Sequence, residues 1–215
     1  FYLCGALCHN CVVEKDMDGN IVYQGPSPDE IAICKGFKSA GCTFLGGNSQ
    51  GECEIDLFGT LRKVNLLMEF PFDSDRKRHS IIVRDGDEYK LFIKGADSSM
   101  VSILSKNLEH PFLKKGVAVL DEFSCVGLRT LVLGMKMISK EQFEKIYNLY
   151  NTAITSSSKK EKLRELCTTV EDNIVLLGVT AIKDHLQENV KESIERFVGA
   201  NIKVWMITGD KLLTA

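Results

Sequence analysis

A run of three basic residues, Arg76, Lys77 and Arg78, stands within PFDSDRKRHSIIV (residues 71–83), and the aromatic residue Phe72 lies just upstream. An aromatic ring can stack on a nucleobase, which contributes about 1–3 kcal/mol, while neighbouring cations attract phosphate. The segment therefore predicts a site for a flat, negatively charged ligand. The alternative is a solvated strand exit, which is what most basic runs are.

Two other short segments carry residue types that suit a phosphate ligand. KGAD (residues 94–97) ends a predicted strand, and its small residues would let a ligand approach the backbone beside Lys94. TGD (residues 208–210) ends an apolar strand with a hydroxyl, a glycine and a carboxylate, and ligands of parallel α/β sheets bind beyond the carboxyl ends of strands. The alternatives are an exposed lysine at a strand end and a turn in which Asp210 caps the next helix.

Length and composition limit the classes of function. The chain has 215 residues, which predicts one or two domains, and a formal net charge of −2, so we expect no nucleic-acid partner and only a local anion site. The longest apolar stretch, residues 174–182, is shorter than the roughly 20 residues of a membrane span. Residues 1–11 lack the charged start and cleavage pattern of a signal peptide. Because the chain begins without Met, we expect a fragment of a larger protein.

The cysteines predict reduced thiols rather than disulfides. There are eight, at irregular spacings and in several cases inside apolar runs, which is typical of a cytosolic chain of this length. Cys4, Cys8, His9 and Cys11 resemble a metal cluster, but the three cysteines recur at helical spacing and no second ligand pair follows. We therefore expect one buried helix face over residues 1–13 and no metal site.

The surrounding residues predict the elements that position these side chains. SPDE (residues 27–30) opens a helix, with Ser27 as its cap and Glu30 completing a capping box, and that helix should end near Gly41. Short links with turn residues then predict antiparallel strands, followed by helices after Gly95. The expected strands cover residues 21–24, 42–58 (a hairpin), 61–72, 78–85, 88–95 and 127–137. Residues 155–162 predict a polar loop or the weak middle of a long helix.

The C-terminal part has a different pattern. Apolar strands at residues 173–184 and 202–210 flank an amphipathic helix over residues 187–199, and this order predicts a parallel βαβ unit. The expected fold class is α+β: an antiparallel sheet flanked by helices, followed by a piece of a parallel α/β domain. We place the first domain at residues 1–174 and the second at residues 175–215.

Taken together, the motifs resemble those of P-type ATPases. SPDE, FDSDRKRHS, KGAD, GLRTL, DHLQ and ITGDK occur in the family's order and at roughly its spacing, over essentially the whole chain. They are most similar to the phospholipid-transporting (flippase) branch, which has SPDE, RKRMS and DKLQ at these places. The chain departs from that pattern at His79, where the branch has Met, at His185, where it has Lys, and at Gly25–Pro26, where small residues such as alanine are more usual.

The resemblance implies the nucleotide-binding domain of a membrane transporter, followed by the start of its HAD-like phosphorylation domain. The implied ligands are ATP and Mg²⁺, with the magnesium ligands mostly outside this chain. These enzymes phosphorylate an aspartate in the motif DKTGT, which is absent here, so no catalytic residue is expected and the chain should bind nucleotide without turnover. A phospholipid substrate, an accessory subunit and a cytosolic location on an integral membrane protein are implied as well.

The resemblance also implies roles for particular residues. By similarity, Phe72 stacks on adenine, Glu30 lies near the base, Lys94 lines the pocket and Arg129 reaches the phosphates. Thr208, Gly209 and Asp210 face the phosphoryl group being transferred. Further candidates are Asp29, Arg76, Arg78 and Asp184.

Three other interpretations stay open. The first is a cation-pumping P-type ATPase, against which SPDE and DHLQ argue. The second is a regulatory, nucleotide-sensing module fused to another enzyme, whose nucleotide contacts would be the same. The third is a phosphatase related to the C-terminal part alone, which leaves most of the chain unexplained.

Overall fold

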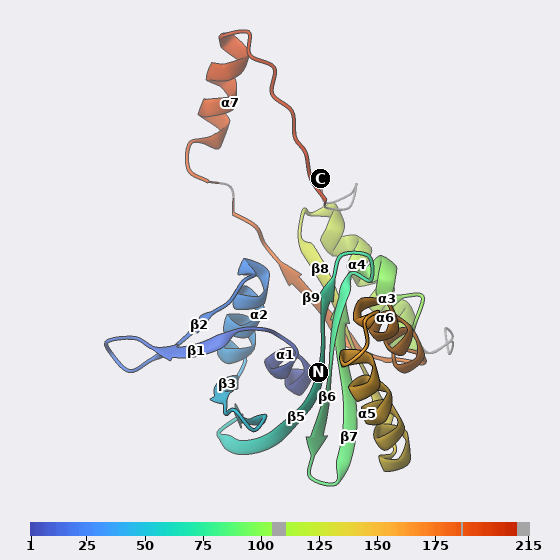
Figure 1. The fold of residues 1–215 in the computed structure, drawn as a ribbon. Coiled ribbons are helices and arrows are strands. Elements are labelled where there is room, and N and C mark those ends of the chain that lie inside the picture. The colour runs from blue at the N-terminus through green and yellow to red at the C-terminus, as the bar shows by residue number, and fades with distance from the viewer. Residues whose placement is uncertain (105–110, 186, 210–215) are drawn as a thin grey trace.

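A seven-stranded antiparallel sheet forms the centre of the protein (Figure 1). The computed structural model describes residues 1–104, 111–185 and 187–209. The strands are ordered β3-β4-β5-β6-β7-β8-β9, so each strand pairs with the next one along the chain. Their bounds are β3 Cys42–Gly47, β4 Glu52–Leu57, β5 Thr60–Asp73, β6 Arg78–Asp85, β7 Glu88–Gly95, β8 Arg129–Ile138 and β9 Val175–Ile182. The predicted antiparallel α+β class is thereby confirmed.

Helices cover both faces of the sheet, and each face has its own hydrophobic core. Successive residues of a strand point to opposite faces, so Ile81 of β6 packs in one core and Ile82 in the other. The first core lies against α1 and α2, and the second against the helices that follow β7 (Figure 1). The helices are α1 Tyr2–Leu7, α2 Pro28–Ser39, α3 Asp97–Met100, α4 Pro111–Cys125, α5 Lys140–Ile154 and α6 Lys159–Val170.

The N-terminal segment folds differently from the prediction of one helix over residues 1–13. Helix α1 ends at Leu7, and a two-stranded hairpin follows, with β1 Val12–Lys15 paired to β2 Ile21–Gln24. In the turn between the strands, Asp16 Oδ1 accepts hydrogen bonds from the backbone N–H groups of Asp18 and Asn20. The helical prediction was wrong beyond Leu7 because Val12 and Val13 pair with β2 instead.

Helix α2 begins and ends where the sequence predicts, but without the predicted capping box. Ser27 is the N-cap residue, yet its side chain makes no capping hydrogen bond. The carboxylate of Glu30 is not available for the box, because it pairs with Lys94 of β7. The helix ends at Ser39, just before Gly41, whose φ of +87° suits glycine.

The polar segment at residues 155–162 proves to be a short break between two helices. Residues 155–158 separate α5 from α6, so the loop alternative of the prediction is confirmed. Helix α5 carries the capping box that α2 lacks: Gln142 N donates to Ser139 Oγ, and Ser139 N donates to Gln142 Oε1. The apolar residues of α5, including Phe143 and Tyr150, pack on the second core.

The C-terminal part does not form the predicted parallel βαβ unit within the described residues. Strand β9 exists, but it pairs antiparallel with β8, from Arg129↔Ile182 to Met135↔Val175. The helix α7 Val190–Gly199 is present, and Figure 1 shows it held away from the sheet. Residues 202–209 form no strand. The apolar pattern of residues 173–184 predicts a strand but does not determine its neighbour. In the structure that neighbour is β8, which runs antiparallel to β9.

A search of the described residues for a helix long and apolar enough to cross a membrane finds none.

Candidate functional site

The centre of the candidate site is an ion pair between Lys94, at the end of β7, and Glu30, in the first turn of α2. Lys94 Nζ lies 2.6 Å from Glu30 Oε1, and the two side chains are only 8% and 14% exposed. The backbone N–H of Asn10 donates to Glu30 Oε2 over 3.2 Å. Burial by itself raises the pKa of Glu30, but His79 and Lys94 outweigh it and lower that pKa to about 2. Glu30 is therefore ionised at neutral pH.

His79 lies directly beside this pair and contacts two carboxylates. It stands opposite Lys94 in the β6–β7 register and is 2% exposed. Its Nε2 is 3.1 Å from Glu69 Oε1, and its Nδ1 is 3.8 Å from Glu30 Oε1. Neither approach is aligned as a hydrogen bond, so the attraction is mainly that of charge. Burial lowers the pKa of His79, but Glu30 and Glu69 outweigh burial and raise the pKa above its usual value.

A second, more exposed ion pair adjoins the first. Arg129, the first residue of β8, places its Nη1 3.1 Å from Oδ1 of Asp29, the neighbour of Glu30 in α2. Both side chains of this pair are partly exposed. The first turn of α2 thus brings together Glu30, Lys94, Asp29 and Arg129, four of the residues that the sequence predicted for one site. We call these four residues the α2 cluster.

Phe72 presents an exposed aromatic ring at the same end of the sheet. In the β5–β6 register, Phe70 lies opposite Ser80. In the β6–β7 register, His79 lies opposite Lys94. The end of β5 that carries Phe72 is therefore separated from Lys94 only by β6. A bulge in β5 falls between Phe70 and Asp73, and Phe72 is 64% exposed whereas Phe70 is buried. Among the described residues, the ring of Phe72 packs against no other aromatic ring. Its faces are therefore available for stacking.

Arg76 and Arg78 are placed differently from the solvated strand exit that their sequence context suggested. Both guanidinium groups bind the carboxylate of Glu171, which follows α6 and whose side chain is fully buried. Arg78 Nε lies 2.7 Å from Glu171 Oε2, Ser80 Oγ donates to Oε1, and Arg76 also donates to two backbone carbonyls of β5. These contacts tie α6 to the sheet on the face opposite Lys94.

The remaining predicted residues lie in the C-terminal part. Asp184 is exposed just after β9, and Thr208 and Gly209 are exposed on the irregular segment 202–209. Asp210 lies outside the described residues. Their proposed role stays a prediction.

Sequence reasoning missed three residues that the structure brings into or beside the site. Glu69 faces His79, and Glu171 binds Arg76 and Arg78. For His79 a signal existed, because it departs from the family motif. For Glu171 no local signal exists, since its partners lie more than 90 residues earlier in the chain, as the separations of 93 and 95 residues show.

Comparison with known proteins gives one consistent result. The profile of the family described as "P-type ATPase, cytoplasmic domain N" matches residues 1–189. The chain is 37% identical over 217 residues to the phospholipid-transporting ATPase IC of Mus musculus, and 38% identical over 217 residues to that of Xenopus tropicalis. It is 37% identical over 213 residues to the phospholipid-transporting ATPase DRS2 of Saccharomyces cerevisiae. These alignments cover 98–100% of this chain but only 16–17% of each relative, so the chain spans about a sixth of the relatives' length.

Proposed function

This chain belongs to the P-type ATPase family as its cytoplasmic domain N, and from that membership we propose that it binds ATP for a phospholipid-transporting ATPase. In this proposal the domain positions ATP so that the γ-phosphate reaches an aspartate outside these 215 residues. The names of the relatives support the phospholipid as the transported substrate. The family match covers residues 1–189, which contain five of the six motifs, and it supports the assignment over those residues.

The observation that carries the proposal is the α2 cluster with the exposed ring of Phe72 at the same end of the sheet. An aromatic ring can stack on any nucleobase. Polar side chains that contact the edge of the base then determine which base is bound. Lys94 is largely buried and already neutralised by Glu30, so this pair suits the uncharged base end of ATP rather than its phosphates. The pair supplies one cationic donor and one anionic acceptor at that edge.

Arg129 suits the phosphate end of the nucleotide. Its ion pair with Asp29 is partly exposed, and exposed pairs contribute only about 0–1 kcal/mol. Leaving Asp29 for a triphosphate therefore costs little. A planar guanidinium can then bind two phosphate oxygens at once, which the ammonium of a lysine cannot do.

Among the described residues, no group of three converging acidic side chains offers Mg²⁺ an all-oxygen site. Magnesium prefers oxygen ligands in octahedral geometry. Within residues 1–104, 111–185 and 187–209, the one group of three converging histidine, cysteine or acidic side chains contains two thiols. We assign this chain no step that depends on the ion.

The contribution of this chain to phosphoryl transfer is positioning. Such reactions are accelerated mainly by holding the reactants in line and by stabilising charge. In the proposal Phe72, Glu30 and Lys94 fix the adenine, and Arg129 directs the phosphates. By similarity, Thr208, Gly209 and Asp210 face the transferred group.

Titration of the ¹⁵N-labelled chain with ATP tests the proposal. We expect saturable shifts in the amides of Glu30, Phe72, Lys94 and Arg129, and a large loss of affinity in Phe72→Ala. The matched control is Phe197→Ala, which removes another exposed phenylalanine, from α7, and should bind ATP like the wild type. A folded wild-type chain that binds no ATP, or a Phe72→Ala variant with unchanged affinity, would overturn the proposed site.

The transport function needs the full-length protein. There, Phe72→Ala should raise the ATP concentration needed for half-maximal movement of a fluorescent phospholipid across reconstituted vesicles. ATP-dependent movement of cations instead of lipid would favour the cation-pumping alternative.

A further inference from the structure

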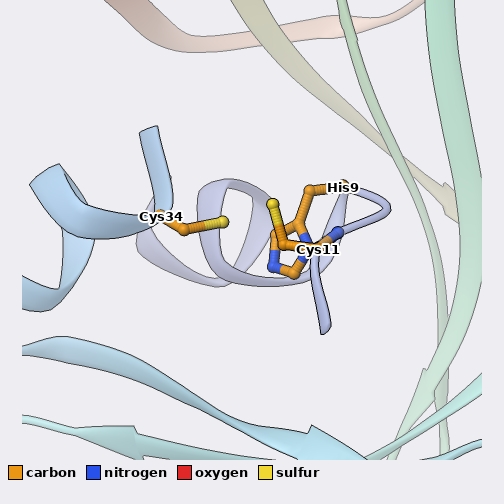
Figure 2. A group of neighbouring side chains, drawn as sticks. All are labelled: His9, Cys11 and Cys34. Carbon is orange, nitrogen blue, oxygen red and sulfur yellow. The ribbon is translucent and has the colours of Figure 1, made fainter. Parts of the chain in front are cut away.

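We propose that His9, Cys11 and Cys34 form a binding site for one thiophilic divalent ion, such as Zn²⁺. The three side chains come from two separate elements: His9 and Cys11 from the loop after α1, and Cys34 from α2. Figure 2 shows the thiols of Cys11 and Cys34 directed toward each other beside the ring of His9. One ligand atom of each residue lies within 4.8 Å of the other two, and all three residues are buried.

The site corrects the expectation that the N-terminal cysteines share one helix face. Cys4 and Cys8 do pack into the sheet, with their thiols directed at the backbone carbonyls of Ile93 and His79. Cys11 does not join them, because α1 ends at Leu7. The sequence argument against a metal site was that no second ligand pair follows, and the fold supplies one further ligand, Cys34.

The hydrogen bonds of His9 prepare one ring nitrogen for a metal. Its Nε2 lies 2.8 Å from the carbonyl oxygen of Ala6, and since a carbonyl only accepts, Nε2 carries the proton. Nδ1 therefore keeps its lone pair, and it accepts the backbone N–H of Cys11 over 3.1 Å. Histidines that bind metals commonly donate their other ring N–H to a backbone carbonyl in this way. An ion would replace the Cys11 N–H at Nδ1.

The net charge of the site and the sulfur and nitrogen ligand atoms both favour a borderline-soft divalent ion. Binding would release one proton from each thiol, so two thiolates, one neutral imidazole and one divalent cation sum to zero charge, which suits a buried position. Sulfur and nitrogen ligands favour Zn²⁺ over Mg²⁺ or Ca²⁺. Zinc–ligand bond lengths imply separations of about 3.5–3.8 Å between ligand atoms, so atoms that lie within 4.8 Å of one another need to approach by no more than about 1 Å.

The neighbouring backbone leaves room for the thiol of Cys11. A Cβ atom at Gly25 would lie 3.1 Å from Cys11 Sγ, so glycine at this position spares the thiol a close contact. Gly25 is one of the places where the chain departs from the family's more usual alanine. The ion would hold the loop after α1 against α2, beside Asn10, whose backbone N–H donates to Glu30 of the α2 cluster.

Cobalt is the probe, because Co²⁺ reports thiolate ligands and tetrahedral geometry by absorption. The fully reduced 215-residue chain is titrated with Co²⁺, then with Zn²⁺. We expect thiolate-to-cobalt charge-transfer bands and visible bands of a tetrahedral ion, saturating at one equivalent and abolished by Zn²⁺. Cys11→Ala and Cys34→Ala should lose the charge-transfer bands or halve them, and His9→Gln should shift the visible bands.

Two control variants separate this site from other thiols. Cys125→Ser removes an exposed cysteine and Cys53→Ala a buried one outside the group, and both should keep the full spectrum. Circular dichroism establishes that each variant is folded. If an alanine variant does not fold, the wild-type spectrum still decides, together with the rise in melting temperature that Zn²⁺ should give to the wild type and less to His9→Gln. A folded, reduced wild-type chain without charge-transfer bands would overturn the proposal, as would bands that persist unchanged in Cys34→Ala.

Discussion

Lys94 and Glu30 join the end of β7 to the first turn of α2 through a contact of 2.6 Å between ammonium and carboxylate. Removing one partner of a largely buried pair leaves the other charge without compensation. We therefore expect Lys94→Met to lower the free energy of unfolding by about 3 kcal/mol. Urea unfolding followed by circular dichroism measures this change. The double variant Glu30→Gln/Lys94→Met should recover part of the loss, and a single variant as stable as the wild type would contradict the argument.

Arg129 should affect the binding of phosphates but not that of the base. Replacing a charge-assisted hydrogen bond costs about 1.5–3 kcal/mol, so Arg129→Gln should weaken ATP and ADP binding about 10-fold to 100-fold. Adenosine, which has no phosphates, should bind the variant as it binds the wild type. Because the Asp29–Arg129 pair is partly exposed, stability should change by less than about 1 kcal/mol. Calorimetric titration with the three ligands checks this, and an equal loss for adenosine would refute a phosphate contact.

Glu171 should act on stability rather than on nucleotide binding. Its fully buried side chain binds both Arg76 and Arg78, so Glu171→Gln leaves two guanidinium groups without their counter-charge. We expect a loss of about 3–5 kcal/mol in the free energy of unfolding, with the ATP affinity of the folded variant unchanged. Glu165→Gln, on an exposed position of the same helix, is the matched control. Reduced ATP affinity without reduced stability would instead indicate that the two arginines contact the nucleotide.

His79 predicts a specific dependence of stability on pH. Glu30 and Glu69 raise its folded-state pKa above 6.5, the value expected in the unfolded chain. Because the pKa is raised, the stabilisation that protonated His79 gives to the folded chain is complete below about pH 6.5. It is lost as the pH rises through the pKa of His79 in the folded chain. The advantage of the wild type over His79→Met in the free energy of unfolding should therefore shrink as the pH rises above about 6.5.

Other titratable or charged groups near His79 do not produce the same pH dependence of the stability difference between the wild type and His79→Met. Lys94 opposes protonation of His79, and it is present in both proteins. Burial lowers the pKa of His9 to about 4, so His9 makes the folded chain less stable as the pH falls below about 6.5. This effect has the opposite pH dependence and is the same in both proteins. Urea unfolding of the two proteins at several pH values measures the difference. A difference that is constant, or that grows with pH, would contradict the assignment.

Much of the fold follows from local sequence signals. The strands of the central sheet alternate between two cores, and turn residues such as Asp85 and Gly86 separate them by short links, so antiparallel pairing follows from the sequence. The order of six motifs identifies the family, which the family profile confirms. The ion pairs of Lys94 and Arg129 with α2 agree with the clustering that the family resemblance implied.

Contacts between distant segments leave no such signal. The capping-box pattern at Ser27 was overridden because Glu30 is drawn to Lys94, 64 residues later. Cys34 completes the thiol group with Cys11 only because α2 packs beside the loop after α1. An apolar strand such as β9 looks the same in sequence whether its neighbour is parallel or antiparallel, so its pairing was not predictable.

The pairing of β9 gives the last prediction, which concerns the domain boundary placed after residue 174. A chain that ends at residue 174 loses β9, so β8 becomes an exposed edge, and the apolar contacts of Leu176, Leu177 and Val179 with the two cores disappear. We expect it to be less stable than the full chain by about 3 kcal/mol or more, or to aggregate. A chain that ends at Lys183 keeps β9 and removes α7 with segment 202–209, whose apolar residues are already exposed. Its free energy of unfolding should equal that of residues 1–215, as measured by urea unfolding of all three chains. Equal stability of the two shortened chains would instead place the boundary at residue 174 and assign β9 to the domain that follows.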